Sequence, residues 1–230
     1  MKATRPIKSG EQIFNDYGPL PRSDLLRMYG YATDNYAKYD VVEFSYDLLE
    51  EMAGKKQDKN NKEWLKRKDA LDEIGLIEDG YALARPETDS KLHDVVPEEL
   101  HMLLRAMCSN DKIPKDKPKD PISLEEAALL SATLTKRLAD FATSAEDDGR
   151  ILAQLRNNEN ISMPQDVSMH RYRMAVEVRK GEKEVLSQLM GLCQDHIGAM
   201  ADKITNGGEK RKHEDDSLNQ PKKAARTART

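Results

Sequence analysis

The sequence predicts a mainly α-helical protein, and three observations support this fold class. Residues with high helix propensity, namely Leu, Ala, Glu, Lys, Met and Arg, dominate the 230 residues. Aromatic residues make up 5% of the chain, charged residues 34%, and the mean hydropathy is -0.78, so we expect a modest core and much solvated helix surface. Two long segments repeat apolar residues every three or four positions, which is typical of amphipathic helices.

The N-terminal part of the chain predicts short elements. Residues 7–17 indicate a reverse turn followed by a short strand over 12–14, and a proline-containing loop comes next. Ser23 is a candidate cap for a short helix over 24–29, because its hydroxyl can accept a hydrogen bond from a first-turn amide. Residues 40–46 alternate loosely between apolar and polar, so they predict either one strand or the lead into a helix.

The middle of the chain predicts further short elements. The polar, lysine-rich residues 55–62 indicate an exposed loop, and a helix around Trp64 and Leu71 follows. In the segment 75–83 an Asp-Gly pair stands between apolar arms, which predicts a β-hairpin. The next helix starts at Pro97. It places four apolar side chains on one face: Leu100, Leu103, Leu104 and Met107.

Two long helices are the best-supported local predictions. Ser123 and Glu126 have the spacing of a capping box, so a helix begins there. Its apolar stripe consists of Ala127, Leu130, Leu134, Leu138 and Phe141. A second helix begins near Ser168 and runs to about Met200, and from residue 206 onward the polar composition predicts disorder. The stripe of this second helix consists of Met174, Val178, Val185, Leu189, Leu192 and Ile197. Three glycines within it cost up to ~1 kcal/mol each: Gly181, Gly191 and Gly198.

Composition and spacing exclude several classes of protein. No apolar run approaches the ~18 residues of a membrane-spanning helix, and the N-terminus lacks the apolar segment of a signal peptide. We therefore expect a soluble intracellular protein whose two cysteines stay reduced. The cysteines and the five histidines show no metal-ligand spacing, so we expect no metal site. A net charge of -4 does not favour a nucleic-acid-binding protein.

A motif near the N-terminus carries the functional prediction. Residues 10–18 read GEQIFNDYG, an apolar strand end that leads into a tyrosine, and residues 25–31 read LLRMYGY. Together these segments resemble the last core motif of the SET-domain protein-lysine methyltransferases, in the branch that includes Rubisco-large-subunit and ribosomal-protein methyltransferases. In that branch a large helical substrate-binding domain follows the motif.

The resemblance implies methylation of a lysine side chain with S-adenosylmethionine as the cofactor. Tyr17 matches the active-site tyrosine of the family, and Tyr29 matches a second tyrosine that lines the lysine pocket. Free lysine titrates near ~10.4, so such a site must deprotonate the amine, align it with the methyl donor and exclude water. A tyrosine hydroxyl can hydrogen-bond near the transfer axis, and its ring can form one wall of a narrow channel. We therefore assign Tyr17 as catalytic and Tyr29 as substrate-binding.

The sequence departs from the family pattern at the cofactor site. That site needs a glycine-containing strand turn and an Asn-His pair, and no Asn-His dipeptide occurs in the sequence. The cofactor-binding residues therefore stay unknown. The interpretation that we favour is the C-terminal portion of a longer enzyme, lacking most of the cofactor site and inactive alone. The alternative is a non-catalytic nuclear helical module that binds the same lysine-bearing partner.

A second resemblance supports the helical domain. Residues 173–186 are similar to the long-helix signature of the Rubisco-methyltransferase-type substrate-binding domain. Within it Arg179, Glu182 and Lys183 have the spacing of exposed ion pairs, so we expect a solvated helix face; the alternative is that they contact the catalytic domain or the substrate. The predicted domains are a C-terminal SET remnant of one strand and one helix over 1–35, the substrate-binding domain over 36–203, and a disordered basic tail over 204–230.

The tail has the layout of a bipartite nuclear-localisation signal. Residues 209–230 carry a net charge of +3, because they hold seven Lys or Arg against four Asp or Glu. Two basic clusters on a polar linker can occupy two acidic grooves of an import receptor at once. The clusters consist of Lys210, Arg211, Lys222, Lys223 and Arg226. We therefore expect a nuclear protein whose partners are an import receptor and a lysine-bearing protein, ribosomal or chromatin-associated, rather than a membrane or a nucleic acid.

Overall fold

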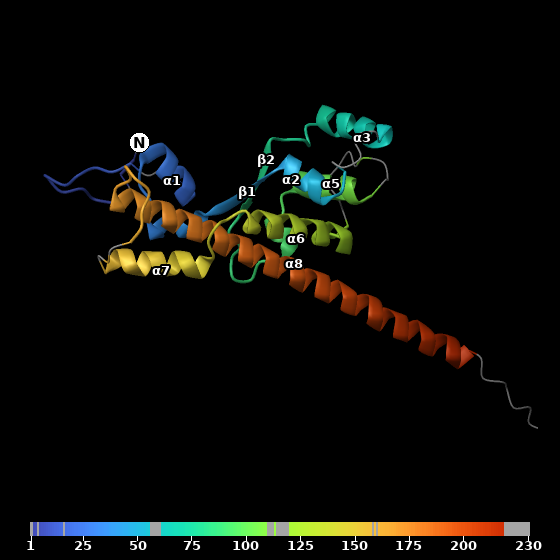
Figure 1. The fold of residues 1–230 in the computed structure, drawn as a ribbon. Coiled ribbons are helices and arrows are strands. Elements are labelled where there is room, and N and C mark those ends of the chain that lie inside the picture. The colour runs from blue at the N-terminus through green and yellow to red at the C-terminus, as the bar shows by residue number, and fades with distance from the viewer. Residues whose placement is uncertain are drawn as a thin grey trace, which may run out of the picture. The chain divides into compact units, whose positions relative to one another are not determined.

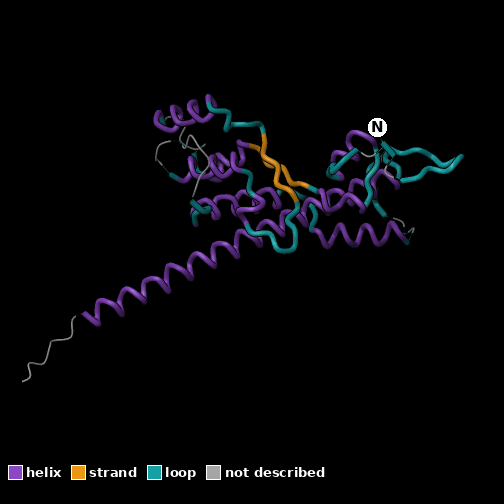
Figure 2. Tube along the Cα trace, turned by 180° about the vertical axis from the view of Figure 1, so that it is seen from behind, coloured by secondary structure: helices purple, strands orange, loops and turns teal. Residues whose placement is uncertain are grey.

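Most of the described chain is helical, which confirms the mainly α fold (Figure 1, Figure 2). The structure is a computed structural model, and from residue 204 to residue 218 it describes the backbone only. The residues that it describes are 2–3, 5–15, 17–55, 61–109, 113, 120–157, 159 and 161–218. The chain divides into two units: unit 1 comprises Met1–Val42 and Ala142–Val185, and unit 2 comprises Glu43–Phe141 and Leu186–Thr230.

Unit 1 brings together two segments that lie far apart in the sequence. Its elements are α1 (Arg22–Tyr29), the 3-10 helix η1 (Asp34–Tyr39), α7 (Ala145–Arg156) and the first part of α8 (Met169–Leu218). α7 runs beside the first part of α8 in both views (Figure 1, Figure 2). An apolar cluster of this unit consists of Leu152, Leu155 and Val176, with Ile151, Ile161, Met163 and Tyr172 packed against it.

Unit 2 contains the later part of α8 and five shorter helices. These are α2 (Tyr46–Met52), α3 (Lys62–Glu73), α4 (Leu92–Val95), α5 (Glu98–Cys108) and α6 (Leu124–Ala139). Both α2 and α5 contact α6. Leucines with no exposed surface form much of its core: Leu49, Leu71, Leu83, Leu103, Leu104, Leu130, Leu134 and Leu189. Within the described part of the chain, no helix has the length and the apolar character needed to cross a membrane.

A two-stranded sheet pairs β1 (Val41–Ser45) with β2 (Gly80–Ala84). The amide of Tyr46, directly after β1, donates to the carbonyl of Asp79, directly before β2, at 3.4 Å. The end of β1 therefore lies beside the start of β2, and the strands run antiparallel. The predicted hairpin within residues 75–83 is wrong, because the strand after the Asp-Gly pair takes its partner from β1 rather than from the residues before that pair.

The structure confirms the predicted starts of two helices. Ser123 Oγ accepts from the Glu126 amide at 3.2 Å, and the Ser123 amide donates to Glu126 Oε2 at 2.9 Å, which forms the capping box of α6. α5 begins directly after Pro97, and its four predicted apolar residues are buried. Residues 40–46 form a strand that leads straight into α2, so both predicted alternatives are present in succession.

Three predictions about local structure need correction, and one helix was missed. Ser23 lies inside α1, which begins at Arg22 and has no side-chain cap. Residues 12–14 do not form a strand, because no strand of the described residues lies beside them to complete a ladder. α7 was not predicted. α8 continues through Asn206, Gly207 and Gly208 to Leu218 rather than ending near Met200, and the lysine, arginine and glutamate residues among 209–214 favour helix there. The domain boundaries at 35 and 203 stay predictions.

Candidate functional site

The structure brings the two predicted site residues of unit 1 into direct contact. The rings of Tyr17 and Tyr29 stack with their centroids 4.2 Å apart and their planes inclined by 21°. Tyr17 is 44% exposed and Tyr29 is 40% exposed, so the pair lies at the surface of unit 1. Their catalytic and substrate-binding roles stay predictions, but two tyrosines separated by twelve residues form one aromatic surface.

Local backbone geometry places each tyrosine. Tyr29 is the last residue of α1, and Gly30 ends the helix in the left-handed conformation, at φ 75°, with its amide bonded to the Leu26 carbonyl at 3.0 Å. Gly18 has φ 78°, a conformation that residues with a Cβ rarely adopt, so the chain can turn directly after Tyr17. The motif therefore needs a glycine after each tyrosine to bring the two rings together.

The stacked geometry limits what this pair can bind. Rings whose centroids lie 4.2 Å apart leave no room for an alkylamine between them. A cation could reach only the hydroxyl groups or an exposed ring face, where it is attracted to the aromatic quadrupole. Tyr31 lies close to the pair: burial raises the pKa of its hydroxyl, and the nearby Tyr36, Tyr17 and Tyr29 raise it further. The sequence analysis gave Tyr31 no role, although it belongs to the same motif.

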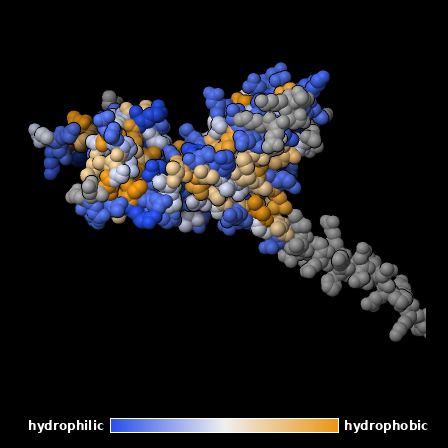
Figure 3. Space-filling view, viewed as in Figure 1, coloured by the Kyte–Doolittle hydropathy of each residue, from blue (hydrophilic) through white to orange (hydrophobic). Residues whose placement is uncertain are grey.

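Exposed apolar side chains accompany the tyrosine pair. Ile13 is 76% exposed and Phe14 is 75% exposed, and Met28 on α1 is also exposed. Ile13 and Phe14 are consecutive residues of a segment without regular secondary structure. Figure 3 shows apolar atoms at the surface of this N-terminal part of the chain. Large apolar side chains exposed in this way mark a surface suited to contact with another polypeptide segment.

The residues around the pair do not by themselves form a site for S-adenosylmethionine. Three cavities among the described residues, of about 480, 390 and 200 Å³, are lined by other side chains, and neither Tyr17 nor Tyr29 borders them. The pair offers ring faces and hydroxyl groups at an open surface rather than an enclosure for a nucleoside and a sulfonium.

The signature on α8 is only partly solvated, which corrects the prediction of a solvated face: Lys183 is buried, whereas the side chain of Arg179 is 32% exposed. Lys183 is 1% exposed, and its Nζ donates to Asp148 Oδ2 at 2.6 Å and to Thr143 Oγ1 at 2.8 Å. Arg179 Nε donates to Asp148 Oδ1 at 3.0 Å, and its Nη2 also contacts that oxygen. The partner Asp148 belongs to α7, so the two cations, one turn apart on α8, hold α7 in place. This ion cluster was missed because its acidic member lies 35 residues from Lys183.

Asp148 stays ionised although it is fully buried. Burial alone would raise the pKa of its carboxyl group, but the hydrogen bonds from Arg179, Lys183 and Thr143 outweigh burial and hold the pKa below its usual value. The same carboxylate raises the pKa of Arg179. Three polar partners therefore compensate one buried negative charge inside unit 1.

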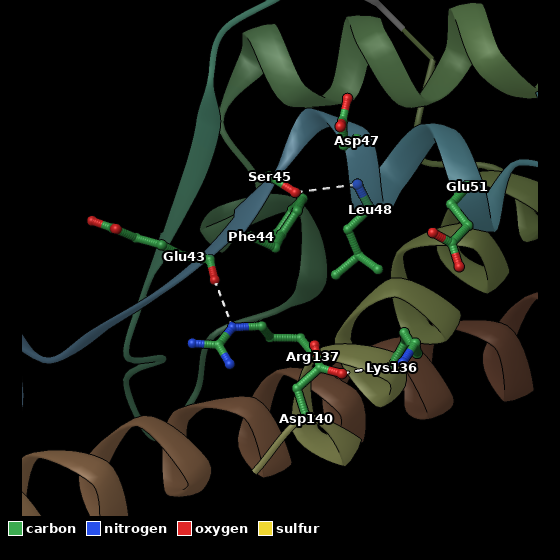
Figure 4. Close-up of a pocket in the computed structure, with 9 residues that line it drawn as sticks. All are labelled: Glu43, Phe44, Ser45, Asp47, Leu48, Glu51, Lys136, Arg137 and Asp140. Carbon is green, nitrogen blue, oxygen red and sulfur yellow. Dashed lines mark hydrogen bonds and ion pairs between the residues drawn. The ribbon is translucent and has the colours of Figure 1, made fainter. Parts of the chain in front are cut away.

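Unit 2 contains the cavity of about 480 Å³ between β1, α2 and the end of α6 (Figure 4). Figure 4 shows Leu48 and Glu51 directed from α2 toward α6. Arg137 Nε donates to the Glu43 carbonyl at 3.0 Å, and Lys136 pairs with Asp140 at 3.1 Å. The lining contains four carboxylates and two cations, so its charge is negative: Glu43, Asp47, Glu51 and Asp140 against Lys136 and Arg137.

The predicted nuclear signal lies outside the described side chains. Lys222, Lys223 and Arg226 follow the last described residue. The backbone at Lys210 and Arg211 is part of α8, but their side chains are not described.

Comparison with known proteins agrees with both resemblances. Residues 58–186 match the family described as Rubisco LSMT substrate-binding. The chain is similar to N-lysine methyltransferase SETD6 of Homo sapiens, with 26% identity over 225 residues that cover 84% of this chain and 43% of that protein. It is also similar to ribosomal lysine N-methyltransferase 4 of Saccharomyces cerevisiae, with 42% identity over 67 residues, 29% of this chain and 13% of that protein.

A third relative is ribosomal lysine N-methyltransferase 4 of Schizosaccharomyces pombe, with 48% identity over 42 residues, 18% of this chain and 9% of that protein. The chain thus spans less than half the length of each of these relatives.

Proposed function

The chain belongs to the Rubisco LSMT substrate-binding family, and we propose that it is the C-terminal portion of a protein-lysine N-methyltransferase that uses S-adenosylmethionine. Three similar proteins are named as lysine methyltransferases, which supports this activity. The observation that carries the proposal is the contact between Tyr17 and Tyr29, the two residues that the motif assigns to the lysine pocket. The absence of an Asn-His dipeptide supports a cofactor site outside this chain.

In this proposal the two tyrosines have different tasks. The Tyr17 hydroxyl hydrogen-bonds near the substrate amine, which fixes the direction of its lone pair. Tyr29 stacks on Tyr17 and limits the positions that the Tyr17 ring can take. The cofactor supplies an activated methyl group, and residues upstream of the described ones hold it. The exposed Ile13 and Phe14 are then covered by that upstream part.

The helical units bind the protein that carries the target lysine. The cavity at the end of α6 is rich in carboxylates, which suits a basic segment of a partner protein. Ribosomal and chromatin-associated proteins are rich in such segments, so a lysine-bearing protein of this kind is the proposed substrate. Lining side chains such as Glu51 would then contact basic side chains of that partner protein (Figure 4).

Methyl transfer tests the proposal in two stages. We expect the 230-residue chain to transfer no labelled methyl group from S-adenosylmethionine to proteins, because its cofactor site is incomplete. A longer protein, made from a reading frame that continues upstream into an Asn-His motif, should transfer methyl groups. In that protein Tyr17→Phe should lower kcat by about 10²-fold, the effect of removing one hydrogen-bonding group at a reacting centre. Tyr39→Phe, a tyrosine of η1, is the matched control and should keep its activity.

Two outcomes would contradict this account. Robust methyl transfer by the 230-residue chain alone would contradict the missing cofactor site. Full activity of the longer protein carrying Tyr17→Phe would contradict the role of the Tyr17 hydroxyl, while leaving the enzyme class intact.

We also propose that the basic tail directs the protein to the nucleus. The support is the spacing of its two basic clusters, which can engage an import receptor together. A fluorescent fusion of the chain should accumulate in nuclei, and Lys222→Ala with Lys223→Ala should spread it through the cell. Lys62→Ala with Lys66→Ala removes the same charge from α3 and should leave the fusion nuclear. Nuclear accumulation that survives the tail substitutions would rule out this signal.

A further inference from the structure

A buried ion pair joins the two ends of the segment of unit 1 that carries Tyr29, residues 22–40. Arg22, the first residue of α1, is 5% exposed, and its Nη2 lies 2.6 Å from Asp40 Oδ2 while its Nε lies 3.1 Å from Asp40 Oδ1. Burial lowers the pKa of the Arg22 guanidinium, but Asp40, together with the nearby Asp34 and Glu184, outweighs burial and raises it. The Arg22 amide also donates to Asp40 Oδ1 at 3.3 Å. The pair therefore ties the start of α1 to the residue that follows η1.

This ion pair rests on the backbone of α8 at Gly181. A Cβ atom at position 181 would collide with Arg22 Nη2 and with Asp40 Oδ2. Neither atom can move away freely, because both are buried and are hydrogen-bonded to each other. Gly181 is thus required by close approach, in contrast to Gly191 of the same helix, where an added Cβ would meet no atom within 4 Å.

The position of Tyr29 depends on that of Arg22, because α1 connects the two residues. Arg22 and Tyr29 are the first and last residues of one eight-residue helix, which moves as a rigid body over such a length. Leu25 on the same helix has no exposed surface. After the helix, the Ala32 amide donates to Met174 Sδ of α8 at 3.3 Å. The tyrosine-bearing segment therefore meets α8 at Met174 and at Gly181, and at Gly181 an added Cβ has no room.

We propose that Gly181 is a positioning residue for the Tyr17–Tyr29 pair. By leaving room for the Arg22–Asp40 ion pair, it fixes α1 on α8 and thereby sets the stacking of the two rings. This gives the glycine of the α8 signature a task distinct from that of Arg179 and Lys183, which hold α7. The consequence for methyl transfer rests on the proposed function, whereas the effect on ring stacking does not.

Nuclear magnetic resonance of tyrosine ring protons in the 230-residue chain tests the positioning role. Each stacked ring shifts the protons of the other upfield. Gly181→Ala should remove most of this upfield shift at both Tyr17 and Tyr29, while the signals of Tyr81 in unit 2 stay in place. Gly191→Ala makes the same change at an open position of α8 and should leave all ring signals unchanged.

A second variant keeps the test decisive if Gly181→Ala fails to fold. Arg22→Lys keeps the charge but loses the forked contact with Asp40, so it should also weaken the upfield shift. The matched control Arg27→Lys changes an exposed arginine of α1 and should have no effect. Unchanged stacking in a folded Gly181→Ala chain, or in Arg22→Lys where the first does not fold, would overturn the inference. If Gly181→Ala loses the stacking but the unaltered longer protein transfers no methyl groups, the positioning role stands and only the proposed function is contradicted.

Discussion

Asp148 shows how a single buried residue holds two helices of unit 1 together. It has no exposed surface, and it accepts hydrogen bonds from Arg179 and Lys183 of α8 and from Thr143 before α7. A buried carboxylate with too few partners would destabilise the fold, because it loses its hydration without compensation. Here the carboxylate has three hydrogen-bond partners. A substitution that removes one of them should therefore destabilise the fold.

We therefore expect Asp148→Asn to lower the free energy of unfolding by about 3–5 kcal/mol, because it leaves two cations near a neutral side chain inside the unit. Chemical denaturation at neutral pH measures this change. Asp147→Asn alters the neighbouring residue, whose carboxylate lies at the surface of α7, and it should have a much smaller effect. Similar losses for the two variants would contradict the importance that we assign to the buried cluster.

The same carboxylate predicts how stability depends on pH. The folded state holds the pKa of Asp148 below its usual value, so the folded protein binds this proton less readily than the unfolded chain does. The stabilisation is complete above the unfolded pKa of about 3.9 and is lost as the pH falls through the lower folded pKa. In Asp148→Asn this part of the acid dependence should disappear from denaturation curves measured across the acidic range.

At the residue scale, the sequence predicted side chains that act within a local motif and missed those that need a distant partner. Tyr17 and Tyr29 stand in one motif, so a resemblance could identify them together. The burial of Lys183 depends on Asp148, and no sequence spacing connects α7 to that turn of α8. The sequence showed that Gly181 lowers the stability of a long helix. The reason for this glycine, the ion pair of Arg22 with Asp40, lies outside that helix.

At the scale of elements, the helices with capping signals were predictable. Ser123 and Glu126 mark the start of α6 because the capping bonds are local. α7 begins with the same arrangement. Ser144 Oγ accepts from the Asp147 amide at 3.0 Å, and the Ser144 amide donates to Asp147 Oδ2 at 2.9 Å. That serine and aspartate are the signal by which the sequence could have revealed α7.

Strands were less predictable, because a strand depends on its partner. β2 has alternating burial and follows an Asp-Gly pair, yet it pairs with β1, far earlier in the chain. The segment at Ile13 and Phe14 has a strand-like composition but no neighbouring strand within the described residues. Propensity can therefore suggest a strand, whereas the ladder that completes it is a property of the whole fold.

At the scale of the whole molecule, surface charge and exposed apolar side chains act against each other. The chain has a net charge of -4 at pH 7 and a calculated isoelectric point of about 5.8, so repulsion between copies vanishes near that pH. Ile13, Phe14 and Met28 then offer apolar surface within one segment of unit 1. Leu65, in the first turn of α3, and Ile74, directly after the last residue of α3, are also exposed in unit 2.

We expect the chain to self-associate near pH 5.8 through its N-terminal apolar segment and to return to monomers well above that pH, where like charges repel. Sedimentation velocity at both conditions measures this. Ile13→Asp with Phe14→Asp should keep the chain monomeric, because it removes apolar surface and adds two negative charges. Leu65→Asp with Ile74→Asp adds the same charge at two separated apolar positions, so this control variant should still associate. Equal suppression by both pairs would show that net charge alone controls association, and that the exposed segment beside Tyr17 takes no part in it.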